Sequence, residues 1–245
     1  MPDAQVPTPA TKPPADRPGD ALNRLNPPLS QRGAALLRLL RGRIDHVIAT
    51  YLKKDQGYRL VDYGCGGMPY RPLFEPYASR YIGVDFPANP RAEVHLRPDA
   101  TVPAPDGIAQ IVLSTQVLEH VPNPFAYLKE CRRLLVPGGL LILTTHGIYK
   151  YHRDPEDLWR WTSPGLVNVL AQMGFRVVSL EGAMGLAPAG AMLLHDALAR
   201  KTPALLRPAL NTVAHAAMLL LDRLHTPAER RKDASVFVVA AIRTP

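Results

Sequence analysis

The chain has 245 residues, 47% hydrophobic and 20% charged, a length and composition that allow the core of one globular domain. Its two cysteines, Cys65 and Cys131, lie far apart without metal-ligand spacing, which argues against a zinc site or a disulfide framework and favours a reducing cytoplasm. The formal charge of +8 comes from scattered basic residues without interleaved aromatics, so we expect a solvated surface and no specific nucleic-acid partner.

Residues 1–29 form an opening segment that is rich in proline and poor in aliphatic residues. Such a segment cannot bury enough apolar surface to offset its ordering entropy, so we predict a disordered tail followed by a single domain over residues 30–245. The tail also lacks the apolar stretch of a signal peptide, so a cytoplasmic protein is expected.

Helical and strand patterns alternate through the middle of the chain. Apolar residues at helical spacing predict a helix that begins at Ser30 as its N-cap and stops at Gly57. Short, almost continuously apolar runs are typical of strands buried on both faces of a parallel sheet. They predict strands at 59–63, 80–84, 92–96, 108–114 and 140–145, with helices clearest at 124–135 and 164–173. The alternation predicts a doubly wound, Rossmann-like α/β sheet.

The last third is predicted to hold two more strands, 175–180 and 235–242, separated by a helical insertion at about 186–228. The insertion carries an apolar stripe, which we expect to pack on the core as a helical layer. A lid or a peripheral membrane contact is the alternative, because its apolar runs are too short and too interrupted to span a bilayer. The stripe consists of Leu210, Val213, Ala214, Ala217, Leu221 and Leu224.

Residues 60–67 end a predicted strand and open a glycine-rich turn, where backbone can approach a ligand closely. A dinucleotide fingerprint would need a third glycine where the chain has Pro69, and no Gly-Lys-Ser/Thr follows to make a phosphate loop. Asp62, two residues before Gly64, suits a ligand with a positive end group such as the amino group of a methionine moiety. Asp85 ends the next strand, where a carboxylate hydrogen-bonds a ribose diol in doubly wound folds.

With these residues the chain resembles the class I S-adenosylmethionine-dependent methyltransferases, in particular the group called methyltransferase type 11, over about residues 58–181. The resemblance implies a mostly parallel seven-stranded sheet with an antiparallel last strand, and S-adenosylmethionine as cofactor. The motifs that carry it are Asp62-x-Gly64-x-Gly66, Asp85, Val117-Leu118-Glu119-His120-Val121-Pro122-Asn123-Pro124 and Leu135-Val136-Pro137-Gly138-Gly139-Leu140-Leu141.

The resemblance also implies which residues bind the polar ends of the cofactor. Gly64 and Gly66 would pass under its methionine part. Asp62 would act on the methionine amino group through water, and Asp85 would take the ribose hydroxyls.

Two further pairs are implied by the same resemblance. Asp99 and Ala100 would read adenine with an acidic side chain and a backbone N–H. Gln116 and Val117, just after the fourth strand, would line the methionine end. The chain departs from the family pattern at Ala109-Gln110, where the family usually has Phe-Asp, and the departure bears on the Asp99 assignment.

Three histidines are candidate general bases. His120 follows the fourth strand and His146 ends the fifth, at the edge where open α/β sheets bind ligands. His152 lies in the next loop, residues 149–162, which is dense in aromatic and charged residues and holds both tryptophans. A hydroxyl acceptor benefits from a base, and histidine titrates near neutral pH. We expect His152 or His146 to be the base, while His120 is also open to a structural interpretation.

The loop resembles a variant found in a subset of these methyltransferases, which often act in the biosynthesis of glycans, lipids and secondary metabolites. The resemblance indicates a small-molecule, sugar or lipid-linked acceptor. A packed loop anchor with a structural arginine is the alternative interpretation of its Trp-Arg-Trp run. The matching residues are His152, Pro155, Asp157, Trp159, Arg160, Trp161 and Thr162.

The sequence therefore predicts an enzyme that transfers a methyl group from S-adenosylmethionine to a hydroxyl of such an acceptor, without a metal. A non-catalytic S-adenosylmethionine-binding protein or partner subunit is the alternative from another class. Methyl transfer to nitrogen or to nucleic acid is less favoured, and the oligomeric state is left open.

Overall fold

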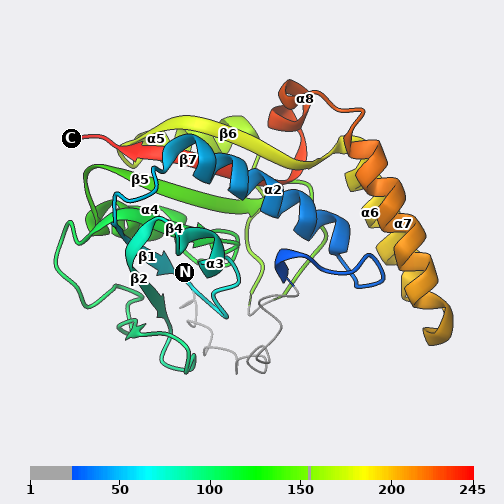
Figure 1. Ribbon diagram of the computed structural model, residues 1–245, viewed down its shortest axis with the longest axis horizontal. Coiled ribbons are helices and arrows are strands. Elements are labelled where there is room, and N and C mark those ends of the chain that lie inside the picture. Colours follow the sequence, from blue (N-terminus) through cyan, green and yellow to red (C-terminus); the bar gives the residue numbers. More distant parts are fainter. Residues whose placement is uncertain (1–23, 154–155) are drawn as a thin grey trace, which may run out of the picture.

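The computed structural model describes residues 24–153 and 156–245, and a seven-stranded sheet forms its centre (Figure 1). The strand order is β3-β2-β1-β4-β5-β7-β6. Strands β1 to β5 are parallel, and β7 runs antiparallel to both of its neighbours. The strands are β1 (Tyr58–Tyr63), β2 (Ala78–Asp85), β3 (Val94–His95), β4 (Ala109–Thr115), β5 (Leu135–His146), β6 (Phe175–Gly185) and β7 (Ala234–Arg243). This architecture confirms the predicted Rossmann-like fold with an antiparallel last strand.

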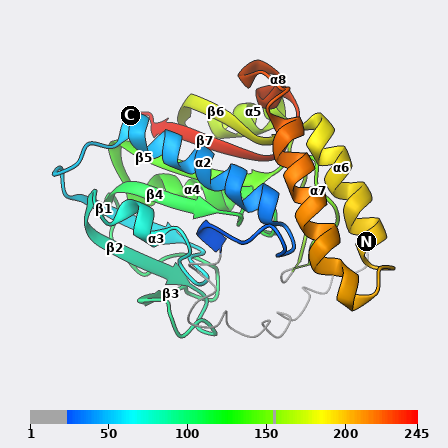
Figure 2. The ribbon, with the colours of Figure 1, turned by 45° about the vertical axis from the view of Figure 1, so that its right-hand side comes forward.

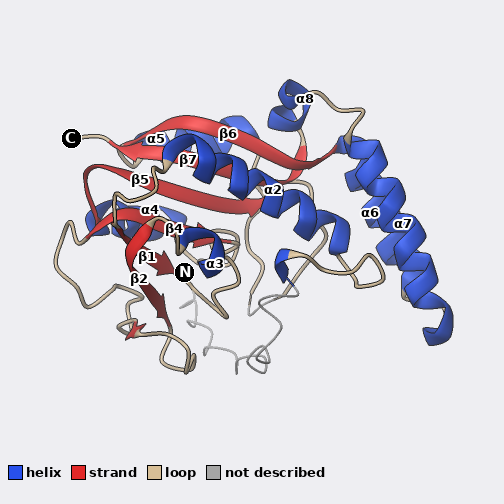
Figure 3. Ribbon diagram, in the orientation of Figure 1, coloured by secondary structure: helices blue, strands red, loops and turns tan. Residues whose placement is uncertain are grey.

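Helices cover both faces of the sheet (Figure 3). Helix α2 packs on one face over one hydrophobic cluster, and α4 and α5 pack on the other face over a second cluster. The helices are α2 (Ala34–Tyr51), α3 (Arg71–Phe74), α4 (Pro124–Leu134), α5 (Ser163–Gln172), α6 (Leu186–Ala199), α7 (Arg207–Asp222) and α8 (Pro227–Lys232), with a 3₁₀ turn η1 (Ala204–Leu206) before α7.

The alternation of side chains along the central strands explains why the sheet is buried on both sides. In β4, Ile111 and Leu113 join the cluster under α2, whereas Val112 between them joins the cluster under α4 and α5. Because successive side chains of a strand point to opposite faces, a continuous apolar run fits only a strand covered on both sides.

Two predictions at the start of the domain are wrong. The first long helix begins after Gly33 at φ 76°, without a side-chain cap, so Ser30 is not its N-cap. Residues 24–29 are not a disordered tail, because Leu25 is buried in the core and Arg38 Nε donates to the carbonyl of Pro27 at 2.8 Å. The carbonyl of Leu29 also accepts from His215 Nδ1 at 2.7 Å, so the segment is attached by one apolar side chain and by backbone acceptors, which leave no periodic pattern in the sequence. The remainder of the predicted tail, residues 1–23, lies outside the described residues.

The helical insertion departs most from expectation. The helices continue to Lys232, beyond the predicted end at about 228. The predicted apolar stripe is only partly buried: Ala214 packs against the core, whereas Val213 is 71% exposed and Leu224, beyond the end of α7, is 74% exposed. The buried side chains of α7 are instead Asn211, His215, Met218 and Asp222.

The crossing of β6 and α8 gives a test of the packing. A Cβ at Gly182 would lie 1.9 Å from the Arg230 carbonyl oxygen, whereas one at Gly190 in α6 would meet nothing within 4 Å. We expect Gly182→Ala to lower the free energy of unfolding by about 2–3 kcal/mol, because the obstacle is backbone. Gly190→Ala, the matched control, should raise it by up to about 1 kcal/mol through helix propensity. Urea unfolding measures both, and equal values for the two variants would contradict this account.

Candidate active site

The glycine-rich turn after β1 contacts the segment after β4. Gly64 has φ +80°, and a Cβ at this position would lie 2.6 Å from Cγ2 of Val117. Gly66 also has a left-handed backbone, at φ +50°. Gly64 is therefore required twice, for its φ angle and for the close approach of Val117. The structure brings together three of the predicted cofactor-binding residues here.

Asp85 lies across the same turn. Its Oδ2 accepts hydrogen bonds from the Gly66 N–H (3.1 Å) and from Asn89 Nδ2 (2.7 Å), and its Oδ1 accepts from the Phe86 N–H (2.8 Å). Asn89 also donates to the carbonyl of Gly66 at 2.8 Å and is buried. Asn89 thus connects the turn to the end of β2. Sequence analysis missed it, since a single polar residue in a loop carries no pattern.

Asp62 is buried beneath this turn with half of its carboxylate unused. Oδ2 accepts from the Tyr81 hydroxyl at 2.6 Å, while Oδ1 has no hydrogen-bond partner among the described residues. Burial raises the pKa of Asp62 to about 7, against the opposing effect of the Tyr81 hydrogen bond. An orphaned carboxylate oxygen costs stability unless a donor reaches it. This oxygen fits an ammonium donor, directly or through water, and its chemistry agrees with the role predicted for Asp62.

The residues predicted to read adenine lie beside the end of β1. The Tyr63 hydroxyl donates to the Ala100 carbonyl at 2.5 Å, which holds this loop at the edge of the sheet. Asp99 is exposed, and its Oδ1 accepts from the backbone and hydroxyl of Thr101; these hydrogen bonds lower the pKa of Asp99. The Ala100 N–H donates to the Arg97 carbonyl at 2.9 Å. Both groups are thus held in a local turn, and their assignment to adenine stays a prediction.

Gln116 marks the point where the chain leaves β4. It has φ 56°, and its backbone N–H and Nε2 both donate to the Thr144 hydroxyl, at 3.0 and 3.1 Å. These bonds fix the segment after β4 against β5, so that Val117 is held over Gly64. The placement is compatible with the predicted contact to the methionine end of a cofactor, which stays a prediction.

All three predicted histidines meet at the carboxyl end of β4 and β5. The ring centroid of His152 lies 5.8 Å from that of His120 and 6.0 Å from that of His146. His120 Nδ1 contacts the Glu156 carbonyl, which can only accept, so Nδ1 carries a hydrogen. No group of three potential metal ligands within residues 24–153 and 156–245 is arranged to hold an ion.

His146 has a partner that sequence analysis named only as part of a motif. Glu119 is fully buried, its Oε1 lies 3.2 Å from His146 Nδ1, and its Oε2 accepts from the Thr145 hydroxyl at 2.9 Å. Burial raises the pKa of Glu119 and lowers that of His146 to about 3. The imidazole is therefore neutral at physiological pH. Tyr149 stacks on it with a centroid distance of 4.1 Å.

Arg160 holds the loop above the histidines. Its Nη1 and Nη2 each bond one oxygen of Asp157 at 2.5 Å. Its other N–H groups donate to the carbonyls of Tyr149 (3.1 Å), Lys150 (2.6 Å) and Trp159 (2.8 Å). All five donors of the guanidinium are thus engaged. This favours the structural interpretation of the Trp-Arg-Trp run, as a loop anchor.

The anchored loop packs against the segment after β4 and forms an open, shallow cavity of about 290 Å³ on its surface. The N–H groups of Leu158 and Trp159 donate to the Glu119 carbonyl at 2.9 and 3.2 Å, and Trp159 Nε1 donates to the Val121 carbonyl at 2.8 Å. Of the loop residues matched by sequence, Pro155 lies outside the described residues. The cavity is lined by Tyr149, Tyr151, Asp157, Leu158, Trp159 and Arg160.

A family model described as a methyltransferase domain matches residues 36–180. Among curated proteins, the chain is 41% identical to a ubiquinone biosynthesis O-methyltransferase of Cereibacter sphaeroides over 141 residues, 47% of this chain and 54% of the relative. It is 36% identical to that of Roseobacter denitrificans over 181 residues, 58% and 69% of the two chains. The chain thus spans about half the length of the first curated relatives that it matches.

Solved structures support the fold alone. The [4+2]-cyclase SpnF is 20% identical with a TM-score of 0.55, over 83% of this chain and 81% of that chain. An S-adenosylmethionine-dependent methyltransferase from Mesorhizobium loti is 19% identical with a TM-score of 0.51, over 86% and 99%.

The Asp62 carboxylate is predicted to lower the stability of the protein without cofactor and to strengthen cofactor binding. The folded state holds a proton on Asp62 up to about pH 7, whereas the unfolded state releases it near the ordinary pKa of 3.8. The protonated Asp62 carboxyl therefore contributes to the free energy of unfolding at low pH, and this contribution is lost as the pH rises through 7. Asp62→Asn keeps an acceptor for Tyr81 and does not ionise. Without cofactor, we expect its free energy of unfolding at pH 8 to exceed that of wild type by about 1 kcal/mol or more.

This advantage of Asp62→Asn should shrink as the pH falls to about 4, and unfolding measured across pH tests it. In the same variant, S-adenosylhomocysteine should bind about tenfold or more weakly by calorimetry, because the charged acceptor is lost. A stability difference that does not change with pH would contradict the buried-carboxylate account.

Arg160→Lys tests the loop anchor. A lysine cannot reproduce the planar fork, so we expect the loop to open and the unfolding free energy to fall by about 1–3 kcal/mol. Because both tryptophans flank position 160, their fluorescence should shift to the red and become easier to quench. Arg80→Lys, at an exposed pair with Glu93, is the control and should leave emission unchanged. Unchanged emission in Arg160→Lys as well would refute the anchor.

Proposed function

The chain belongs to the methyltransferase domain family, and from this premise we propose that it methylates a hydroxyl oxygen on the ring of a small phenolic acceptor. Its cofactor is S-adenosylmethionine, which supplies an activated methyl group on a sulfonium centre. The observation that carries the proposal is the cluster of three histidines, one of them in the aromatic loop, beside the turn that Gly64 and Val117 hold together.

The residues present fit this cofactor. The unpartnered Oδ1 of Asp62 suits the amino group of the methionine part, and Gly64 leaves room where any side chain would strike Val117. Asp85, kept in place by Gly66 and Asn89, is the proposed ribose acceptor. These residues bind and orient, and orientation supplies much of the rate of an in-line displacement, up to about 7–11 kcal/mol.

Within the cluster we assign the base to His152. His146 is 3% exposed and its lowered pKa of about 3 makes it a weak base, so we assign it to positioning, backed by Glu119. His152 is partly exposed and lies within about 6 Å of both other rings. It would take the hydroxyl proton as the oxygen attacks the methyl carbon.

A phenolic ring suits the open cavity whose lining residues all belong to the loop. A volume of about 290 Å³ with tyrosine and tryptophan walls suits one planar ring better than a chain of sugars. The curated relatives are named for O-methylation in ubiquinone biosynthesis, which supports an oxygen acceptor. Sugar and lipid-linked acceptors, and a cytoplasmic location, stay untested predictions.

The test measures transfer of a radiolabelled methyl group from S-adenosylmethionine to catechol and related phenols. His152→Ala should lower kcat by about 10²–10⁴-fold while S-adenosylhomocysteine binds as in wild type. Asp85→Ala should weaken that binding. His46→Ala, an exposed histidine in α2, is the control and should keep full turnover.

The outcomes separate the alternatives. Methyl transfer to phenols that survives His152→Ala would refute the base assignment. Transfer to amines but not to phenols would replace the oxygen acceptor by nitrogen. Binding of S-adenosylhomocysteine without methyl transfer to any acceptor in an extract would support a non-catalytic S-adenosylmethionine-binding protein, because a methyltransferase fold does not determine the reaction.

A further inference from the structure

Helices α6 and α7 form a hairpin that presents apolar side chains to solvent. Residues 186–224, the α6–α7 hairpin, run side by side at the edge of the molecule, and the end near residues 200–207 stands away from the sheet (Figures 1 and 2). Of the fourteen large hydrophobic side chains exposed in the described part of the chain, nine lie on it. They are Leu186, Leu193, Leu194, Leu198, Leu205, Leu206, Val213, Leu220 and Leu224.

The inward face of this hairpin is part apolar, through Ala189, Met192 and Met218 of the cluster under α2, and part polar. Asn211 Nδ2 donates to the Ser30 carbonyl at 2.8 Å, and its Oδ1 contacts His195 Nε2 at 3.1 Å. His215 Nδ1 donates to the Leu29 carbonyl at 2.7 Å. Surface helices of soluble proteins normally bury their leucines and expose their polar residues. Here hydrogen bonds and a few apolar contacts attach the hairpin, and nine large apolar side chains stay exposed, available to another apolar medium.

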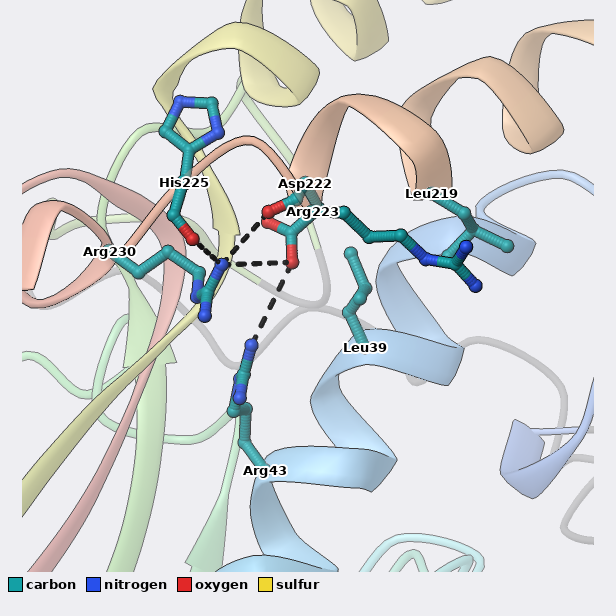
Figure 4. A pocket seen from close by; sticks show the side chains of 7 residues that line it. All are labelled: Leu39, Arg43, Leu219, Asp222, Arg223, His225 and Arg230. Carbon is teal, nitrogen blue, oxygen red and sulfur yellow. Dashed lines mark hydrogen bonds and ion pairs between the residues drawn. The ribbon is translucent and has the colours of Figure 1, made fainter. Parts of the chain in front are cut away.

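The hairpin also keeps its negative charges inside. Asp196 and Asp222 are the only acidic residues between 186 and 224, and both are buried. Asp196 pairs with Lys150 and, at 3.4 Å, with Arg32. Asp222 Oδ2 lies 3.7 Å from both Arg43 and Arg230, at the base of the hairpin (Figure 4).

Its positive charges are left outside. Arg200, Lys201, Arg207 and Arg223 are exposed, and none forms an ion pair with a described carboxylate. The Arg223 side chain points away from the cluster around Asp222, although it lines the same pocket (Figure 4). The other three flank the hairpin end, where Leu205 is 90% and Leu206 57% exposed. Exposed leucines between cations are complementary to a surface that is anionic outside and apolar beneath.

We propose that the α6–α7 hairpin docks on the surface of an anionic lipid bilayer. Leu205 and Leu206 enter the boundary between headgroups and acyl chains, and Arg200, Lys201 and Arg207 contact the phosphates. A second copy of the chain fits less well, because pairing two such hairpins would bring cations together without a compensating exposed carboxylate.

Docking differs from spanning the membrane. Within the described residues, one segment, Ala204–Asp222, is long and apolar enough by length and composition to cross a bilayer. Crossing would require Asn211, His215 and Asp222 to leave their protein partners, and a charge in the bilayer centre is costly. The hairpin therefore lies along the surface, held by its polar face.

Docking would also place the acceptor loop near the bilayer. Lys150, in the loop after β5, pairs with Asp196 of α6, and Arg160 holds the Lys150 carbonyl at 2.6 Å. The inference does not rest on which acceptor is methylated, because the surface is independent of the base and of the cofactor residues.

Vesicle flotation of the full chain tests the proposal. We expect the protein to float with vesicles of equal parts phosphatidylcholine and phosphatidylglycerol at low salt. It should float poorly with phosphatidylcholine alone or at high salt. Leu205→Glu combined with Leu206→Glu should reduce partitioning about tenfold or more. Replacing Arg200, Lys201 and Arg207 by glutamine should reduce it by about fivefold for each charge.

Matched controls keep the result specific to the hairpin. Phe125→Glu changes an exposed apolar residue on α4, and glutamine at Lys53, Lys54 and Arg59 removes three exposed charges elsewhere. Both controls should float like wild type. Calorimetric binding of S-adenosylhomocysteine should be unchanged in every variant, which shows that each is folded.

Three outcomes would overturn the proposal. The first is the absence of flotation with anionic vesicles at low salt. The second is flotation that the hairpin variants leave unchanged or that the controls reduce equally. The third is a dimer by light scattering that Leu205→Glu with Leu206→Glu dissociates, since the hairpin would then be an interface between copies of the chain.

Discussion

The reversal of strand order between β1 and β4 determines where ligands can bind in this molecule. On one side of this point the sheet continues through β2, and on the other through β5, so the connections diverge and leave a crevice at the carboxyl ends of the strands. The close approach of Gly64 and Val117 spans the crevice, and a side chain at position 64 would force it apart. Asp62, Asp85 and His146 gather here because each ends a parallel strand or lies within two residues of its end.

Within the site, burial and ionisation oppose each other at two carboxylates. Asp62 and Glu119 are both withdrawn from water, which raises the pKa of each. Each also has one oxygen bonded by a hydroxyl, of Tyr81 and Thr145 respectively, and one oxygen without a hydrogen bond from the residues that the structure describes. Stability alone would not retain such groups, because an unsatisfied buried oxygen is destabilising. The two remaining oxygens differ in their surroundings: that of Asp62 suits a ligand, and that of Glu119 lies against His146.

The fold was predictable from sequence because strands buried on both faces leave a continuous apolar pattern and because glycine-rich turns are strongly constrained. The candidate site was predictable where a residue ends a strand or belongs to a motif beside that end. His120, His146 and His152 meet because two parallel strands end together and the next loop turns back over them. Asn89 and the five bonds of Arg160 depend on loop geometry, which no periodicity encodes. Ser30 is not the N-cap because Gly33, with a left-handed backbone, takes that position directly before Ala34.

The α6–α7 hairpin shows why an apolar stripe does not by itself reveal which face of a helix is buried. In α7 the apolar stripe through Val213 and Ala217 and the polar residues both recur at helical spacing, so either face satisfies the pattern. The choice was made by partners distant in sequence: the carbonyls of Leu29 and Ser30 for His215 and Asn211, and Arg43 for Asp222. Hydrogen bonds and ion pairs to buried groups are directional and costly to leave unmade, whereas apolar contact is not directional. These polar partners, together with Met218 in the core, therefore set the orientation of α7 and left Val213 and Leu220 outside.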